Sequence, residues 1–161
     1  MLLYIRHGDD RGEDEYKHDR PLNARGTKKA AKAAKRLIEK YGHPDIVIVS
    51  PYRRAVETSD AMTASFVRSL EHRCDPRIAQ RLSEKQRADP KLHPETRLQV
   101  DVTEDQDAFK RRVAEHFEEV RKQDGATWCI THQVVIEEIA SNVGVKIPTN
   151  LDFLDHVVVL E

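Results

Sequence analysis

The sequence is poor in cysteine, in aromatic residues and in net charge. Its 161 residues include two cysteines, and aromatic residues make up only 6% of the chain. Cys74 and Cys129 fit neither a disulfide framework nor a metal-binding pattern, so we expect a reducing, cytoplasmic setting. The 27 lysines and arginines nearly cancel the 28 aspartates and glutamates, so the net charge predicts neither nucleic acid nor a membrane as a partner.

Long apolar runs are missing as well. The run at 1–5 is too short for the core of a signal peptide and has no basic region before it. No later segment approaches the roughly 20 apolar residues that a membrane-spanning helix needs. The length suits one hydrophobic core and is short for two, so we expect a single domain over residues 1–161.

Short apolar runs alternate with segments of helical periodicity. The runs at 2–5, 46–49, 128–131 and 156–160 predict buried strands. Helices are predicted between them from apolar spacing, at 30–41, at 51–70, from 103 onwards and at 134–143. This alternation predicts an α/β fold, a three-layer α/β/α sandwich with a mostly parallel central sheet.

The helix boundaries carry their own signals. Gly42 and Gly144 are predicted to end two helices. Ser50 is predicted to cap the 51–70 helix with Pro51 as its first residue, and Thr103 is predicted to cap another helix. Residues 71–102 contain three prolines and no clear periodicity, so we expect a loop-rich excursion on the substrate side.

Histidines and arginines follow three of the predicted strands. Arg6-His7-Gly8 follows the first strand, a segment that contains Arg54 follows the second, and Thr131-His132 ends the third. In open α/β sheets ligands bind at this carboxyl edge. Imidazole is a capable nucleophile near neutral pH, and guanidinium groups bind phosphate oxygens in pairs. The pattern therefore indicates phosphoryl transfer.

The same motifs resemble those of the histidine phosphatase superfamily, which includes the cofactor-dependent phosphoglycerate mutases. Arg6-His7-Gly8 looks like the family signature, and the segment 19–26, with its Pro-Leu and Gly, is similar to the one that leads into the first helix. The segment 50–58 resembles the second motif, in which the phosphate-binding arginine directly precedes Ala55. Leu82-Ser83-Glu84 and Thr131-His132 resemble the two later motifs, in the family's order.

The resemblance implies a role for each matched residue. His7 would attack phosphorus and form a phosphohistidine, and Glu84 would protonate the leaving oxygen and then activate water. Arg6, Arg54 and His132 would bind the phosphoryl oxygens. Neither a metal nor another cofactor is implied. Arg53 is expected to be a surface residue because neighbouring helix residues point in different directions.

Some alternatives stay open. Asp9 and Asp10, beside the predicted nucleophile, compete with Glu84 for the role of proton donor. A phosphoglycerate mutase is the rival reaction, although Asp9-Asp10-Arg11-Gly12 replaces the Ser or Thr and the Asn usual in mutases, and Gln133 replaces the Gly that often follows the second histidine. A non-catalytic phosphate-binding module is the third possibility. We therefore expect a metal-independent phosphatase acting on a small phosphomonoester or a phosphoprotein, with substrate and oligomeric state undetermined.

Overall fold

One five-stranded sheet forms the centre of the protein. The computed structural model describes residues 1–10, 20–66, 70–81 and 104–160. The strands lie in the order β3-β2-β4-β1-β5. β1, β2, β3 and β4 run parallel, whereas β5 pairs antiparallel with β1. Their bounds are β1 Leu2–Arg6, β2 Ile46–Val49, β3 Glu71–Cys74, β4 Thr127–Thr131 and β5 His156–Leu160.

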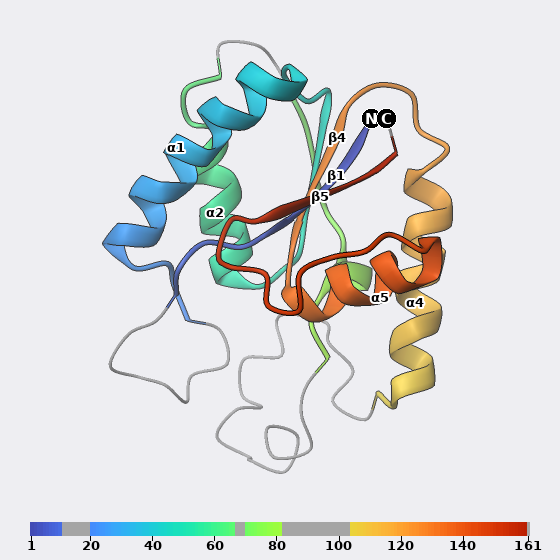
Figure 1. Cartoon of the computed structure of the whole chain (residues 1–161). Helices are drawn as coiled ribbons and strands as arrows, with labels where there is room; N and C mark the ends of the chain where they lie inside the picture. Colours follow the sequence, from blue (N-terminus) through green and yellow to red (C-terminus); the bar gives the residue numbers. More distant parts are fainter. Residues whose placement is uncertain (11–19, 67–69, 82–103, 161) are drawn as a thin grey trace.

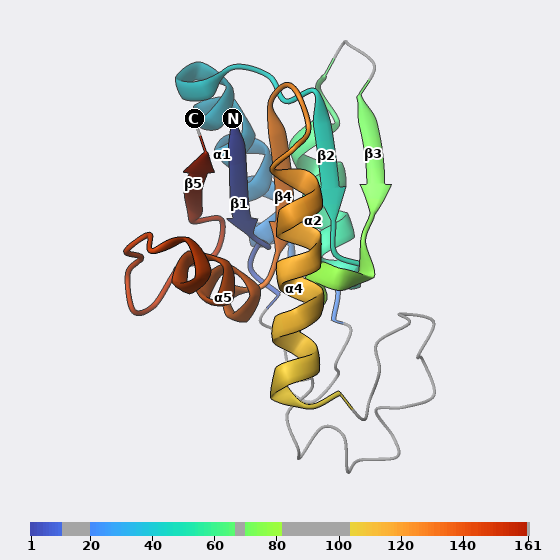
Figure 2. The same ribbon diagram turned by 90° about the vertical axis from the view of Figure 1, so that its right-hand side faces the viewer.

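Helices cover both faces of this sheet (Figure 1). α1 and α2 lie on one face, and α4 and α5 lie on the other, where Figure 2 shows them in front of the strands. None of the helices in the described part of the chain is both long and apolar enough to cross a membrane. The layers confirm the predicted α/β/α arrangement. The bounds are α1 Ala24–Tyr41, α2 Arg53–Thr63, the short helix η1 Pro76–Ile78, α4 Gln106–Val120 and α5 Gln133–Val143.

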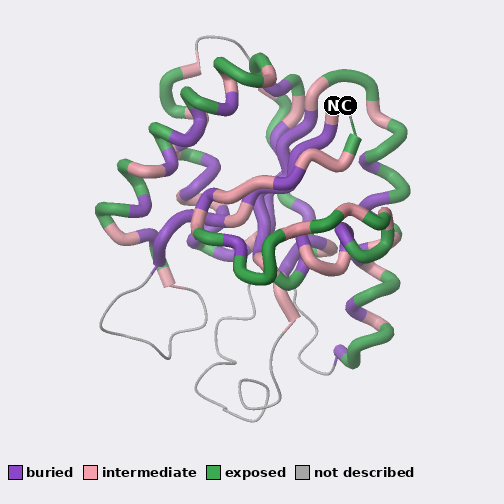
Figure 3. Tube along the Cα trace, viewed as in Figure 1, coloured by how far each residue is buried: buried purple, intermediate pink, exposed green. Residues whose placement is uncertain are grey.

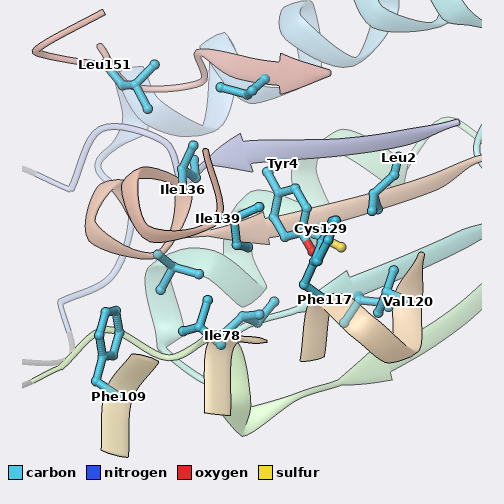
Figure 4. Close-up of a cluster of buried hydrophobic side chains, with 14 residues drawn as sticks. Leu2, Tyr4, Ile78, Phe109, Phe117, Val120, Cys129, Ile136, Ile139 and Leu151 are labelled. Atoms are coloured by element: carbon cyan, nitrogen blue, oxygen red, sulfur yellow. The ribbon is translucent and has the colours of Figure 1, made fainter. Parts of the chain in front are cut away.

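The sheet is buried on both faces, which explains why its central strands are apolar without alternation. In β1, Leu2 and Tyr4 pack into the cluster beneath α4 and α5, and Leu3 and Ile5 pack into the cluster beneath α1 and α2. Figure 4 shows the first of these clusters. In Figure 3 the central strands carry the colour of buried residues. The edge of the sheet where these strands end is therefore held rigidly from both sides.

The sequence predicts irregular chain from residue 71 onwards, and this is wrong for Glu71–Cys74, which form β3. These residues are polar and mostly exposed because β3 is an edge strand. Its order comes from the parallel pairing with β2, in which Val49 lies opposite Cys74. An edge strand of this kind needs no apolar run, so the pattern gives no signal for it. Residues 82–102 lie outside the described part of the chain.

The limits of α2 also differ from the prediction. The helix begins at Arg53 with Tyr52 as its N-cap, and no side chain caps it, so the prediction of Ser50 as the cap is wrong. It ends at Thr63 instead of Leu70. Helix propensity alone does not set such an end, because tertiary contacts override it.

The other helix ends agree better with the sequence. Gly42 and Gly144 end α1 and α5 with positive φ angles of 81° and 72°, as predicted. Asp105 caps α4 by accepting a hydrogen bond from the backbone N–H of Ala108. The predicted cap, Thr103, lies outside the described residues.

Candidate active site

Three adjacent strands bring the three predicted motifs to one edge of the sheet. β4 lies between β2 and β1, and all three run in the same direction. Backbone hydrogen bonds continue past the strand ends, because the N–H of His7 donates to the oxygen of Thr131 and that of Ser50 donates to the oxygen of Ile130, at 2.9 and 3.0 Å. The side chains that follow these strands are thereby fixed next to one another.

His7 has its two ring nitrogens in different environments. Its Nδ1 lies 2.8 Å from the carbonyl oxygen of Gly8, which can only accept, so Nδ1 carries the proton. Its Nε2 accepts a hydrogen bond from Nε of Arg54 at 3.2 Å and therefore presents its lone pair to the cluster. Burial lowers the pKa of His7 to about 3, and the positive charge of Arg54 adds to this effect. The ring is therefore neutral near neutral pH, with its lone pair on Nε2.

Arg54 stands at the centre of the cluster. It is the second residue of α2, where the helix dipole adds positive potential, and it is 4% exposed. Its Nη2 lies 3.4 Å from Nδ1 of His132, and its Nε lies 3.6 Å from Oδ2 of Asp10. The ring of Tyr52 lies 4.6 Å beneath its Cζ atom. The guanidinium is thus held from several sides while it faces both histidine rings.

His132 completes this group from the end of β4. It is the N-cap residue of α5, is 2% exposed, and its ring centroid lies 5.1 Å from that of His7. Its Nε2 lies 2.8 Å from Oγ of Ser50. The structure therefore brings together His7, Arg54 and His132, as the sequence predicts.

Arg6 joins the cluster through the chain segment that precedes β5. Its guanidinium donates to the carbonyl oxygen of Leu151 and lies 4.5 Å from the centroid of the Phe153 ring, which is itself 5.7 Å from the ring of His7. Its Nε is buried and meets no hydrogen-bond partner among the described residues. Its charge also contributes to lowering the pKa of His7. Arg6 therefore places a half-buried cation near the predicted nucleophile.

Segment 151–155 was not identified from the sequence, which carries no motif there. It holds Arg6 through its backbone as well, because the N–H of Arg6 donates to the oxygen of Asp155 and the N–H of Leu154 donates to the oxygen of Arg6. Leu154 adopts a left-handed conformation with φ of 67°, which is costly for a residue with a branched side chain. Such strain is typical of segments fixed by their surroundings near functional sites.

The acidic candidates fall into two groups. Glu84 lies outside the described residues. Asp10 is buried, and its Oδ2 lies 3.4 Å from Nη2 of Arg20 in addition to its contact with Arg54. Asp9 is also buried and accepts a backbone hydrogen bond from Asn23 at 3.0 Å. Asp10 is therefore a partner of two arginines, one of which, Arg20, the sequence did not single out.

Two residues of α2 tie the loops of the site to this helix. Thr58 accepts a hydrogen bond from the N–H of Gly8 at 2.9 Å and donates to the carbonyl oxygen of Arg54 at 2.6 Å. Glu57 accepts from the N–H of Leu22 at 2.7 Å. Both lie within the motif 50–58, and no feature of the sequence other than that position singles out either residue.

The other arginine of the motif 50–58, Arg53, lies outside the cluster. The side chain of Arg53 is 59% exposed and pairs with Glu57 at 2.7 Å, which confirms it as a surface residue. In the described ranges, no three His, Cys, Asp or Glu side chains are grouped so that they could hold a metal ion.

Several solved structures share the fold of this chain. Among solved structures, the chain is similar to a phosphoglycerate mutase from Bacillus anthracis str. Sterne, with a TM-score of 0.69, 17% identity, and coverage of 95% of this chain and 84% of that one. It is also similar to a phosphoserine phosphatase from Entamoeba histolytica in complex with 3-phosphoglyceric acid (TM-score 0.66, 18% identity, 96% and 87% covered). A third is the protein histidine phosphatase SixA complexed with tungstate (TM-score 0.66, 15% identity, 95% and 83% covered).

At these identities the likeness concerns the fold. A search of curated proteins found no match. The family comparison reaches further, because the model of the histidine phosphatase superfamily (branch 1) matches residues 2–152. That range contains every residue of the cluster, from Arg6 to His132, as well as Glu84. The chain therefore belongs to branch 1 of the histidine phosphatase superfamily.

Proposed function

We propose that this protein is a phosphatase that hydrolyses a phosphomonoester or a phosphoprotein through a phosphohistidine on His7. The observation that carries the proposal is the orientation of the His7 ring. Because Nδ1 donates to the oxygen of Gly8, the lone pair on Nε2 faces the guanidinium of Arg54, where a phosphoryl group would be held. Membership of the superfamily and phosphatases among the similar structures support this reaction class.

In this proposal Arg6, Arg54 and His132 bind the phosphoryl oxygens. The N–H groups of Arg54 point at ring nitrogens of both histidines. A phosphate dianion would accept these donors instead, which frees Nε2 of His7 for attack on phosphorus. Arg6 supports the same role, since its Nε is a buried donor without a partner among the described residues. A donor left unpaired in a buried place is costly unless a ligand accepts it.

We assign proton transfer to Glu84, as the family resemblance implies. Asp10 is the weaker candidate because its carboxylate already pairs with Arg20 and Arg54, which fits a role in holding these arginines. In the first step Nε2 of His7 would form a bond to phosphorus while the bond to the leaving oxygen breaks and Glu84 supplies a proton. In the second step Glu84 would take a proton from a water molecule whose oxygen forms a bond to phosphorus while the bond from phosphorus to Nε2 of His7 breaks, which releases phosphate and restores the neutral ring.

The test is hydrolysis of p-nitrophenyl phosphate at mildly acidic pH in the presence of a metal chelator. The wild-type protein is expected to release p-nitrophenol, and His7→Ala is expected to abolish the release. Equal activity of His7→Ala and wild type would refute the proposal. Phosphate binding without turnover in the wild type would instead identify a phosphate-binding module.

The substrate is to be found by comparing a few phosphorylated compounds. Because the similar structures include a protein histidine phosphatase and a phosphoserine phosphatase in complex with 3-phosphoglyceric acid, the first compounds to try are a phosphohistidine peptide, phosphoserine and 3-phosphoglycerate. A coupled assay with 3-phosphoglycerate and bisphosphoglycerate would detect the rival mutase reaction. The proposed setting is the reducing cytoplasm, with which the free thiols of Cys74 and Cys129 are compatible.

A further inference from the structure

Phe153 is an aromatic residue that lies in the site without belonging to any of the motifs. It is half-buried in segment 151–155, one residue beyond the range that the family model matches. The centroid of its ring lies 4.5 Å from Cζ of Arg6 and 5.7 Å from the ring centroid of His7. The family resemblance assigns it no role, although its ring lies against two residues of the site.

Segment 151–155 forms a turn that is closed by its own hydrogen bonds. Oδ2 of Asp155 accepts from the N–H of Asp152 at 2.7 Å, and Oδ1 of Asp152 accepts from the N–H of Phe153 at 2.8 Å. The N–H of Asp155 donates to the carbonyl oxygen of Asp152 at 3.1 Å. Leu154 adds the left-handed conformation described above. The backbone on both sides of Phe153 is therefore fixed, and the position of its ring is set by the turn.

The groups through which this turn holds the Arg6 side chain are neutral. The guanidinium donates to the carbonyl oxygen of Leu151, and the ring of Phe153 lies over its Cζ atom. The aspartates of the turn, Asp152 and Asp155, direct carboxylate oxygens to backbone N–H groups instead. A carbonyl group and a ring hold the guanidinium without neutralising its charge, so the charge stays available to an anion.

The ring also leaves the hydrogen-bond donors of Arg6 unused. A guanidinium is planar, and its N–H groups lie in that plane, where they match the oxygens of a phosphate. A ring over the face attracts the cation and restricts its plane without accepting any of these hydrogen bonds. The buried Nε of Arg6 has no partner among the described residues. The contact with Phe153 therefore orients Arg6 while its Nε–H remains a donor for a ligand.

Arg54, the other predicted phosphate-binding arginine, has a similar neighbour. The ring of Tyr52 lies 4.6 Å from its Cζ atom and 4.8 Å from the ring of His132. Each arginine is thus stacked on an aromatic ring that also lies against one of the two histidines. Tyr52 is fully buried, whereas Phe153 is half-buried, so Phe153 can be changed with less effect on the core.

We propose that Phe153 is a positioning residue that holds the guanidinium of Arg6 in the plane from which it binds a phosphoryl oxygen. The proposal rests on the proposed function, because that function assigns Arg6 to the phosphoryl group. Phe153 acts through Arg6 and does not itself touch the phosphoryl group. Without the ring, Arg6 keeps its charge but loses its fixed orientation, so phosphate is bound more weakly.

The experiment is a double-mutant cycle of Phe153→Leu and Arg6→Gln. Phe153→Tyr keeps the ring, and Phe66→Leu is the matched control, because Phe66 is also half-buried but packs against Trp128 and His43. Titration calorimetry with inorganic phosphate measures the affinity of each protein. NMR of the Nε–H group of Arg6 shows whether the ring of Phe153 shifts its signal, and thermal denaturation shows that each variant is folded.

Phe153→Leu should weaken phosphate binding about threefold to tenfold, as expected for the loss of a cation–π contact to a half-buried guanidinium. In the Arg6→Gln protein the same change should alter the affinity by less than about twofold, because no guanidinium remains to be oriented. Phe153→Tyr and Phe66→Leu should bind phosphate like the wild type. The Nε–H signal of Arg6 should lose its ring-current shift in Phe153→Leu and keep it in Phe153→Tyr.

Two results would overturn the proposal: wild-type phosphate affinity in Phe153→Leu, or the same loss of affinity with and without the Arg6 side chain. These measurements do not require turnover. A wild type that binds phosphate with this coupling, but never forms a phosphohistidine, would refute the proposed phosphatase and still support the role of Phe153. Hydrolysis through His7 without the coupling would refute the role of Phe153 alone, and a wild type that binds no phosphate would refute both.

Discussion

Gly26 offers a test of how the first helix holds the nucleophile loop. It lies in the first turn of α1, and a Cβ atom added there would lie 2.3 Å from the carbonyl oxygen of Asp9 and 3.0 Å from its nitrogen. Ordinary contact begins at 3.4 Å, so the two backbones would have to separate by about 1 Å. Because the obstacle is backbone, rotation of a side chain cannot relieve it.

Gly26→Ala should therefore destabilise the protein, although alanine favours a helix. The gain from helix propensity is at most about 1 kcal/mol, whereas overpacking against a fixed backbone costs about 1–3 kcal/mol. We expect the free energy of unfolding to fall by about 1–2 kcal/mol, with a decrease in Tm of about 2–8 °C for a domain of this size. We also expect kcat/KM for p-nitrophenyl phosphate to fall, because Asp9 connects directly to Gly8 and Asp10 in the site.

Urea denaturation at neutral pH measures the first effect and steady-state kinetics the second. Thr27→Ala is the matched control, because Thr27 is the next residue in the same turn and is exposed. It should leave kcat/KM unchanged. A Gly26→Ala protein at least as stable as the wild type, with wild-type kcat/KM, would show that the close approach of α1 to Asp9 has no importance.

Three further predictions concern the site itself. The pKa of His7 is lowered to about 3, below its unfolded value of 6.5, so stability from this group is complete above pH 6.5 and falls as the pH decreases towards 3. Urea denaturation should show a free energy of unfolding that is about 2 kcal/mol lower at pH 5 than at pH 7.5 because of this group. His7→Gln should not show this decrease. Arg54→Ala should lower kcat by about 10²–10³, while Arg53→Ala, at an exposed position, should keep wild-type kcat in the same assay; equal losses would contradict the assignment. Glu84→Gln should slow hydrolysis of an alkyl phosphate far more than that of p-nitrophenyl phosphate, whose leaving group needs little protonation, and equal slowing would exclude Glu84 as the proton donor.

The sequence predicts the strands that position the site residues, because these strands are identified by local patterns. Apolar runs of four or five residues identify β1, β2 and β4, and their parallel pairing brings His7, Arg54 and His132 to one edge. The residue before Ala55 also proves to be the buried arginine, whereas Arg53 faces solvent. These features follow from strand order and helix periodicity, which are readable along the chain.

Contacts between distant parts of the chain are what the sequence does not predict. The hydroxyl of Ser50 looks like a helix cap until its partner at position 132 is known, because the local motif fits both uses. Segment 151–155 holds Arg6 across 145 positions and carries no recognisable pattern. β3 is missed for a related reason, since its polar residues are ordered only by pairing with β2.

The central claim is that His7 carries the phosphoryl group on Nε2, because Nδ1 donates to the oxygen of Gly8. A single-turnover reaction with ³²P-labelled substrate, quenched in base, measures this directly. We expect an acid-labile, base-stable phosphoenzyme whose label maps to His7, with ³¹P–¹⁵N NMR placing it on Nε2, and no label in His7→Ala. Label on another residue, or turnover without any phosphoenzyme in the wild type, would contradict it.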